Sequence, residues 1–381
     1  MQFQTDCLGV GGMGFFLAPG QYSPPRPRER VLLPGPSLGQ RGGMLEVVLA
    51  EPMQETCYLD AVALEIIDVP PGWEVLPDER MGTNDPMPTS ELLYSARSLR
   101  PIRASRGGDV LNAIRSVDGI AADPGLIDSR FIGRVLSPLE LELEFAEPLD
   151  SIGERLVMVL DGWVEYPYSQ TMFAAWQAGA GYSPITIEAR IGDGQWSTVH
   201  TDIGYPAGMQ RTCVLPLDGM PSGSTELRIR CDLELYVDAV RVAAIEPCPQ
   251  ARVHRRLPVT AVLEQPGYPR RLSLPQRRPG YDWDDQVPFW DVRSQRGEYT
   301  RLGDVHSIIA SDDQAVAVFG AGEAIRCRFE PPPRLPRGWN RQVVLDVKGW
   351  CKDMDLMTRD GGTVEPVPWS APLRDRHRSG R

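Results

Sequence analysis

Apolar and polar residues alternate along much of the chain, in short stretches with the two-residue period of β-strands. In residues 139–145 every second residue is apolar and the three between them are glutamates, so a strand here has one apolar and one charged face. The same alternation runs through 185–191 and 227–232, and Gly192-Asp193-Gly194 joins the first of these to residues 196–199 as a hairpin. The pattern predicts an all-β protein with antiparallel sheets.

Helical patterns are confined to short stretches near 110–117 and 172–178. Between them and around them, roughly eight predicted strands lie from about 105 to 246, enough for a complete antiparallel β-sandwich or jelly roll. The chain also holds 37 glycines and 36 prolines, scattered between apolar segments. Glycines and prolines distributed in this way are typical of many short strands joined by turns.

Four landmarks occur twice, in the same cyclic order, which indicates an internal repeat. The middle of the chain carries the whole series, whereas the N-terminal part carries only the closing strand and the C-terminal part only the opening strands. The sequence therefore predicts duplicated β-sandwich units. The paired landmarks are Gly108-Asp109-Val110 with Gly303-Asp304-Val305, 141–145 with 325–329, 156–163 with 343–350, and Tyr58-Leu59-Asp60-Ala61-Val62 with Tyr236-Val237-Asp238-Ala239-Val240.

This order divides the chain into five parts. We expect an N-terminal β region at 1–95, a complete β-sandwich at 105–246, a basic Pro-rich linker at 247–285, a C-terminal β region at 286–373, and a disordered tail at 374–381. Two arrangements stay open. In the first, the N-terminal and C-terminal regions together complete one sandwich, into which the central sandwich is inserted. In the second, the chain holds two neighbouring sandwich units, one of which has a divergent or truncated partner.

Charge and composition argue against several classes of function. The formal net charge of −11 over 381 residues argues against general attraction to nucleic acid or to anionic membranes. No apolar run of about 18 residues predicts a membrane span. The first residues lack the pattern of a signal peptide and have the pattern of a strand interior, so the chain has the character of a segment of a longer polypeptide. The seven cysteines have no C-x-x-C spacing, which favours buried free thiols over a disulfide framework or a zinc site.

The sequence does not predict an enzyme. The glycines between Gly9 and Gly14 imitate a dinucleotide-binding loop, but a strand and a turn follow where that motif needs a helix. The four histidines stand far apart, and no G-x-S-x-G motif is present. A pair of carboxylates beside aromatic loops is the one catalytic alternative, since glycosidases use two such groups.

Two Gly-Trp loops are the candidate ligand-binding sites, because aromatic faces beside polar groups stack on sugar rings or anchor a protein partner. The alternative is that the two tryptophans close the ends of their sandwiches. The candidate residues are Asp161, Trp163, Glu165, Tyr166, Tyr168 and Trp176 at the first loop, and Trp350 and Lys352 at the second.

The two repeats differ in charge at matching positions. Asp161 and Glu165 align with Lys348 and Lys352, the chain's only lysines, and Glu142 and Glu144 align with two arginines, Arg326 and Arg328. One hypothesis is that the two units meet through these complementary faces, or that their loops bind ligands of opposite charge. The other is that the charges lie on ordinary solvated strand faces.

Five motifs spread over the chain carry a likeness to known proteins. They are 5–14 with Ala18-Pro19-Gly20-Gln21-Tyr22, Thr56-Cys57-Tyr58-Leu59-Asp60, 161–169, 349–355, and Thr363-Val364-Glu365-Pro366. Together they resemble a C-terminal region of large bacterial proteins with FG-GAP, ASPIC/UnbV or tetratricopeptide repeats. That resemblance implies export or a place at the cell surface and a role in interactions, and it assigns no chemistry to particular residues.

The closing strand around Asp238 is similar to that of galactose-binding-like jelly rolls, in which an aspartate at this point can hold structural calcium. Asp353 with Asp355 is a second calcium candidate, because the ion prefers hard oxygen ligands. No other cofactor is expected. We therefore expect a non-catalytic module that binds a carbohydrate or a protein, with a carbohydrate-active enzyme and a structural spacer as alternatives.

Overall fold

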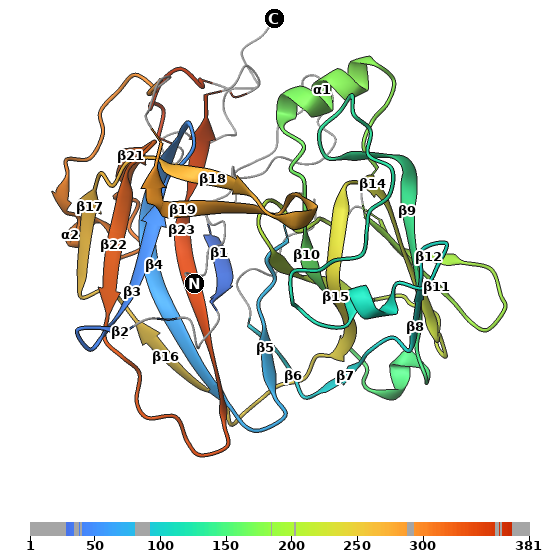
Figure 1. Ribbon diagram of the computed structural model, residues 1–381. Coiled ribbons are helices and arrows are strands. Elements are labelled where there is room, and N and C mark those ends of the chain that lie inside the picture. Colours follow the sequence, from blue (N-terminus) through green and yellow to red (C-terminus); the bar gives the residue numbers. More distant parts are fainter. Residues whose placement is uncertain are drawn as a thin grey trace, which may run out of the picture.

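The protein is an all-β molecule of two β-sandwiches that lie side by side (Figure 1). The computed structural model describes residues 28–33, 38, 40–80, 92–183, 185–201, 203–287, 293–354, 358 and 360–367. Every ladder between its named strands is antiparallel. The predicted fold class is confirmed.

The central sandwich is formed by nine strands from the middle of the chain. They are β7 (Arg97–Leu99), β8 (Arg103–Ser105), β9 (Arg134–Glu144), β10 (Leu156–Val164), β11 (Thr186–Arg190), β12 (Ser197–His200), β13 (Arg211–Pro216), β14 (Glu226–Leu233) and β15 (Leu235–Ala244). One sheet has the order β13-β10-β15-β7 and the other has the order β12-β11-β14-β9-β8.

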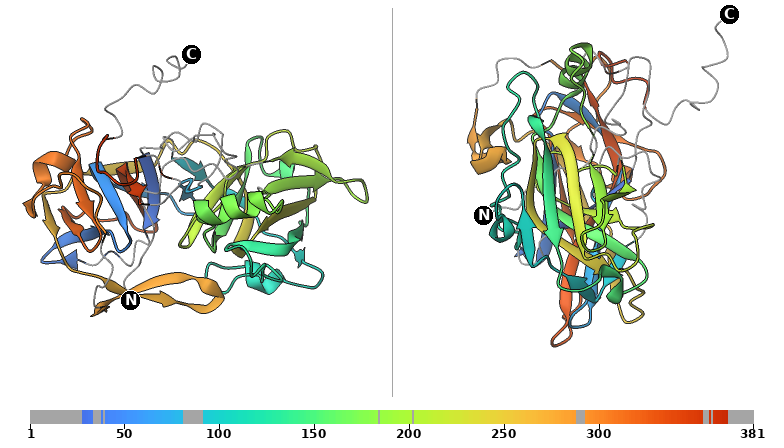
Figure 2. Two further views of the ribbon diagram at one scale, coloured as in Figure 1. Left: turned by 90° about the horizontal axis from the view of Figure 1, so that it is seen from above. Right: turned by 90° about the vertical axis from the view of Figure 1, so that its right-hand side faces the viewer.

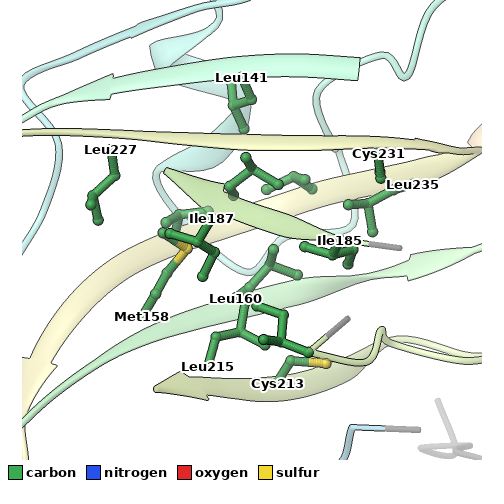
Figure 3. Close-up of a cluster of buried hydrophobic side chains, with 14 of the residues drawn as sticks. Leu141, Met158, Leu160, Ile185, Ile187, Cys213, Leu215, Leu227, Cys231 and Leu235 are labelled. Atoms are coloured by element: carbon green, nitrogen blue, oxygen red, sulfur yellow. The ribbon is translucent and has the colours of Figure 1, made fainter. Parts of the chain in front are cut away.

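The core of this sandwich follows from the alternation in the sequence. Leu141 and Leu227 point inward from one sheet and meet Met158 and Leu215 from the other (Figure 3). All four side chains are fully buried. The glutamates between the leucines of β9 point outward, where Arg228 of β14 lies close to Glu142.

The second sandwich, here called the terminal sandwich, takes its strands from both sides of the central one. They are β1 (Arg28–Leu33), β2 (Gln40–Arg41), β3 (Met44–Ala50), β4 (Glu55–Val69), β16 (Arg252–Arg256), β17 (Thr260–Glu264), β20 (Gly303–Asp304), β21 (Ala317–Gly320), β22 (Ala324–Phe329) and β23 (Asn340–Asp353). One sheet has the order β1-β23-β4-β16, with β21 also pairing with β4, and the other has the order β2-β3-β22-β17-β20.

The long ladder between β4 and β23 holds the terminal sandwich together. It runs from Val69 paired with Asn340 to Glu55 paired with Asp353. Strands that precede and follow the central sandwich in sequence therefore share one sheet.

The expected linker at 247–285 consists largely of strands. Its first half supplies β16 and β17 to the terminal sandwich. Some of the arginines that gave the segment its basic character pair with acids of neighbouring strands; Arg255, for example, lies 3.0 Å from Glu65 and 2.6 Å from Asp346. Its second half forms a hairpin of β18 (Pro269–Ser273) and β19 (Pro279–Gln286), which extends from the terminal sandwich toward the central one (Figure 2).

A smaller hairpin, β5 (Glu74–Leu76) with β6 (Leu93–Ser95), lies between the two sandwiches (Figure 1). Leu76 and Leu93 pack on the outer face of a central sheet, whereas Val75 packs on the outer face of a terminal sheet. The covered residues are Val157, Val159, Val214 and Ala243 on the central side, and Ile67, Val69 and Val344 on the terminal side. Burial of this apolar surface joins the two sandwiches.

Just after this hairpin's first strand, Glu79 connects backbones of both sandwiches. Its Oε1 accepts the Leu32 N–H at 2.5 Å, and its Oε2 accepts the Thr212 N–H at 2.7 Å. Beside it, the buried ion pair of Asp78 and Arg80 is satisfied by further backbone contacts.

Helices are few and short. They are α1 (Ser169–Gln177), α2 (His306–Ile309) and 3-10 turns at Leu111–Ile114, Leu149–Ser151 and Pro275–Arg277. The first 3-10 turn and α1 lie where the sequence pattern predicts helix. No described helix has the length and apolar character needed to span a membrane.

Candidate functional site

The first Gly-Trp loop is at the end of β10, where the β10–β15 ladder shifts register between Asp161 and Gly162. A Cβ on Gly162 would lie 2.3 Å from the Tyr236 carbonyl oxygen, so only glycine fits there. The close approach lets Trp163 stack on Tyr236, with ring centroids 5.5 Å apart and planes 15° apart.

Trp163 is fully buried, and the tip of the β18–β19 hairpin covers it. Its indole Nε1–H donates to the Gln276 carbonyl oxygen at 2.9 Å, and the Arg278 guanidinium lies 5.8 Å from the ring centroid. The Gln276 side chain makes two further bonds to the backbone of Ala121, each 2.8 Å long. The ring faces are therefore occupied by the protein itself, and Trp163 closes the end of its sandwich.

The second Gly-Trp loop has the same arrangement with a different cover. Trp350 stacks on Tyr58, with centroids 5.2 Å apart and planes 13° apart, and only 4% of it is exposed. The Tyr58 hydroxyl donates to the Val364 carbonyl oxygen at 2.6 Å. Lys352, whose pKa is lowered by burial, donates to the carbonyl oxygens of Thr363 and Glu365. Trp350 and Lys352 thus bind a later segment of their own chain.

Asp161 is also buried and lies apart from the loop surface. It accepts a bond from the Thr212 hydroxyl at 2.6 Å and pairs with Arg241 at 3.2 Å. Burial raises its pKa, an effect that Arg241 opposes. These contacts give Asp161 a structural role between β10, β13 and β15.

The remaining candidates of the first loop lie where the chain enters α1. Tyr166 packs against the central core and meets Tyr168 edge to face, with centroids 5.3 Å apart. Tyr168 is 36% exposed and accepts a hydrogen bond from Arg271 of the hairpin. Glu165 is partly exposed and lies close enough to Tyr168 and Arg271 to interact electrostatically with each.

Helix α1 presents the most exposed aromatic ring of this region. Trp176 is 52% exposed and stacks on Phe173, three residues earlier on the same helix face, with centroids 5.7 Å apart and planes 20° apart. Ala175 faces the core and is fully buried, which fixes the orientation of the helix. We call Tyr168, Phe173 and Trp176 the α1 aromatic surface.

The carboxylate of Asp238, a calcium candidate, is hydrogen-bonded to donors of the protein itself. Its carboxylate accepts the N–H groups of Asp118 and Gly119 and the side-chain amide of Gln210, which lies 2.6 Å away. The residue is fully buried, and burial raises its pKa. Its observed role is to anchor the turn at Gly119, whose φ of 81° requires the left-handed region.

An equivalent turn in the terminal sandwich is held in the same way by Asp60. Its Oδ1 accepts the N–H groups of Asp313 and Gln314 at 3.2 and 3.0 Å, and its Oδ2 lies 2.7 Å from the Lys348 ammonium. Gln314 adopts a φ of 70°, close to that of Gly119. Both aspartates therefore anchor a turn across the end of a sandwich.

Of the second calcium candidate, Asp353 with Asp355, only Asp353 lies in the part of the chain that the structure describes. The Asp353 backbone oxygen accepts a bond from Gln295 at 3.3 Å, and Asp355 lies outside the part of the chain that the structure describes. Within that part, the group whose ligand atoms converge as a metal would require is a different one, Glu51 with Cys57 and Cys351.

The charged residues that differ between the repeats do not join the two sandwiches. Arg326 pairs with Glu46 and Glu264, and Arg328 pairs with Glu46, all within one terminal sheet. Glu144 pairs with Arg103 inside a central sheet. The hypothesis of complementary docking faces is wrong, because each sheet neutralises its own strand faces and the apolar β5–β6 hairpin lies between the sandwiches.

The cover supplied by Gln276 is the main feature of the site that the sequence pattern did not predict. The available signal was a Pro-Gln-Arg-Arg-Pro stretch between two strand-like segments, 269–273 and 279–286. A hairpin is predictable from it, but the surface on which the tip docks is not. No protein-family model, curated protein or solved structure matches this chain.

Proposed function

We propose that the chain is a non-catalytic binding module that contacts its ligand through the α1 aromatic surface, as part of a longer exported polypeptide. The observation that carries the proposal is the stacked pair of Phe173 and Trp176, of which Trp176 leaves about half of its surface in water. Large aromatic side chains are usually buried in folded proteins, and an exposed one on a rigid element is a common anchor for ligands.

Carbohydrate is the ligand class that fits this surface best. The indole face can stack on the apolar C–H face of a sugar ring. Arg271, Glu165 and the Tyr168 hydroxyl, which lie close to one another, supply donors and acceptors for sugar hydroxyl groups. The helix is fixed by its buried Ala175, so the aromatic rings are held before a ligand arrives.

The geometry of Asp161 favours binding over glycoside hydrolysis. A glycosidase needs two carboxyl groups facing one substrate, about 5 to 10 Å apart. Glu165 lies beside the α1 aromatic surface, but Asp161 is buried against Thr212 and Arg241. The two acids that flank the first loop, Asp161 and Glu165, are thereby divided between an interior and a surface position.

The test is a glycan array probed with the purified chain and with two variants. Trp176→Ala removes the exposed ring, and Trp339→Ala removes a partly exposed tryptophan that lies on the terminal sandwich over Arg252. We expect the chain to bind a subset of glycans, Trp176→Ala to lose that binding, and Trp339→Ala to keep it. Equal binding by both variants would place the site elsewhere.

An array without any signal for the unmodified chain would rule out carbohydrate as the ligand class. The surface itself is then tested by cross-linking from position 176 in the parent organism's envelope fraction. Specific cross-links to one protein would support a protein-binding module, and their absence would support a structural spacer.

A further inference from the structure

Two buried cysteines and a buried glutamate meet inside the terminal sandwich. The Cys57 and Cys351 Sγ atoms are 2.9 Å apart, which is closer than two unbonded sulfur atoms normally approach. The Glu51 Oε2 lies 3.1 Å from the Cys57 sulfur and 3.9 Å from the Cys351 sulfur. All three residues are at most 5% exposed.

The strand register makes this a direct cross-strand pair. Cys57 of β4 and Cys351 of β23 are Cα partners in the antiparallel ladder. Partners opposite each other in such a ladder have Cα atoms about 4.5 to 5.5 Å apart, within the range that a disulfide requires. No backbone movement is therefore needed to join the two sulfur atoms.

The pair also lies near an end of its ladder. Only Thr56 with Lys352 and Glu55 with Asp353 follow it. Pairs near an end of a ladder open more often than central ones, so opening of these last pairs on the β23 side gives a small oxidant access to the sulfur atoms, while β21 keeps its pairing with β4. The other described cysteines, Cys213, Cys231, Cys248 and Cys327, are free and have no sulfur neighbour of this kind.

Glu51 is placed to take up a proton. Its Oε1 accepts the Met53 N–H at 2.6 Å, which holds the carboxylate with Oε2 toward the sulfurs. The Cys57 thiol donates to that oxygen. Burial raises the pKa of the Cys57 thiol, so a nearby proton acceptor is needed before it can act as a nucleophile.

We propose that Cys57 and Cys351 are a redox-active pair that forms a disulfide by exchange with a disulfide-bearing oxidant, with Glu51 as the general base that accepts the Cys57 proton. The Cys57 thiolate attacks the oxidant, forms a mixed disulfide and releases one thiol. Cys351 then attacks the Cys57 sulfur, and the second thiol leaves with the Cys351 proton. Two protein thiols are oxidised, and one oxidant disulfide is reduced to two thiols.

A metal site at Glu51, Cys57 and Cys351 would explain fewer of these observations than a redox-active cysteine pair does. Closed zinc sites have four protein ligands, whereas three donors converge here among the residues that the structure describes. Tetrahedral coordination would also push the two sulfur atoms apart, because each Zn–S bond is about 2.3 Å long. The exchange reaction instead begins from sulfur atoms that are already within reacting distance.

The experiment exposes the full folded chain to glutathione disulfide and counts thiols after denaturation. We expect two of the seven thiols to be lost, and non-reducing peptide mapping to show a link between positions 57 and 351. Seven remaining thiols, a link that involves another cysteine such as Cys7, or a metal ion that co-purifies and protects the pair would overturn the proposal.

Variants separate the roles. Cys351→Ser should trap the mixed disulfide with glutathione on Cys57, while the control Cys327→Ser, in the same core, should leave the 57–351 link unchanged. Glu51→Gln should slow formation of the link at least about tenfold without changing the end point, and Glu51→Asp should restore part of the rate. An unchanged rate in Glu51→Gln would remove Glu51 from the reaction. These outcomes are independent of ligand binding at α1.

Discussion

The hairpin tip over Trp163 allows a quantitative test of what fastens the two sandwiches at that end. Gln276 donates to and accepts from the backbone of the buried Ala121, through two bonds of 2.8 Å. Each such bond contributes about 1 kcal/mol, so Gln276→Ala should weaken docking of the tip by about 2 kcal/mol. The open form of the hairpin then becomes roughly thirtyfold more populated.

The backbone at this position provides an internal check. Gln276 has φ 56° and ψ 37°, a left-handed conformation that costs a non-glycine residue about 1 to 2 kcal/mol. Gln276→Gly loses the same two side-chain bonds but relieves this cost. The hairpin tip of Gln276→Gly should therefore dock about 1 kcal/mol more tightly than that of Gln276→Ala. Its docking should still be weaker than that of the unmodified chain.

Limited trypsin digestion measures the opening, because the hairpin strand β18 contains Arg271. Cleavage after Arg271 should rise about thirtyfold in Gln276→Ala and by a smaller factor in Gln276→Gly. A synthetic peptide covering 265–290 with each substitution corrects for the intrinsic cleavage rate. A change of less than about threefold in Gln276→Ala would refute the reasoning, since it would mean that the side-chain amide does not hold the tip.

Three further outcomes follow from the buried carboxylates. Asp238→Ala should lower the free energy of unfolding by about 2 to 3 kcal/mol in urea titrations, because it leaves three donors unpaired, and Asp60→Ala should do the same in the other sandwich. Chelation with EDTA should leave the melting temperature unchanged, because protein donors occupy Asp238; a fall would reveal a calcium site. Burial raises the pKa of Glu79 from 4.5 to about 7, so the folded chain keeps a proton that the unfolded chain releases in this window. Its free energy of unfolding should therefore fall, by up to about 3 kcal/mol, as the pH rises from about 4.5 to 7, and Glu79→Gln should flatten that slope in pH-dependent thermal melts.

The strand pattern was predictable because it depends on neighbours in sequence. The alternation at 139–145, 185–191 and 227–232 lies in β9, β11 and β14, and the turn at 192–194 joins β11 to β12. In each case burial of one strand face is enough to impose the two-residue period.

The segment at 247–285 was misjudged because its composition conceals its register. Seven arginines and several prolines predicted a basic linker packed on acidic surface. Arg255 does face acids, Glu65 and Asp346, but it does so from β16, within a sheet whose other strands are remote in sequence. Partners of this kind become visible only when the sheet is assembled.

Whether each tryptophan ring is covered likewise depends on another segment of the chain, distant in sequence for Trp163 and 14 residues later for Trp350. Nothing near Trp163 or Trp350 in sequence shows whether the ring is covered. Gln276 covers the first and Val364 lies in the cluster that covers the second. The exposure of Trp176 was closer to predictable, because a short helix with Ala175 on its buried side leaves the opposite face in water.

The pairing of β4 with β23 sets an order of events during synthesis. About 270 residues separate the end of β4 from the start of β23, and at roughly 5 to 20 residues per second the ribosome needs about 15 to 50 s to make them. For that time the apolar β4 has left the ribosome without its principal neighbour, and every strand of the central sandwich is synthesised during the same interval. The nascent chain must therefore shield one of its most apolar strands until synthesis reaches β23, and a chaperone that holds extended apolar segments would be most needed in this interval.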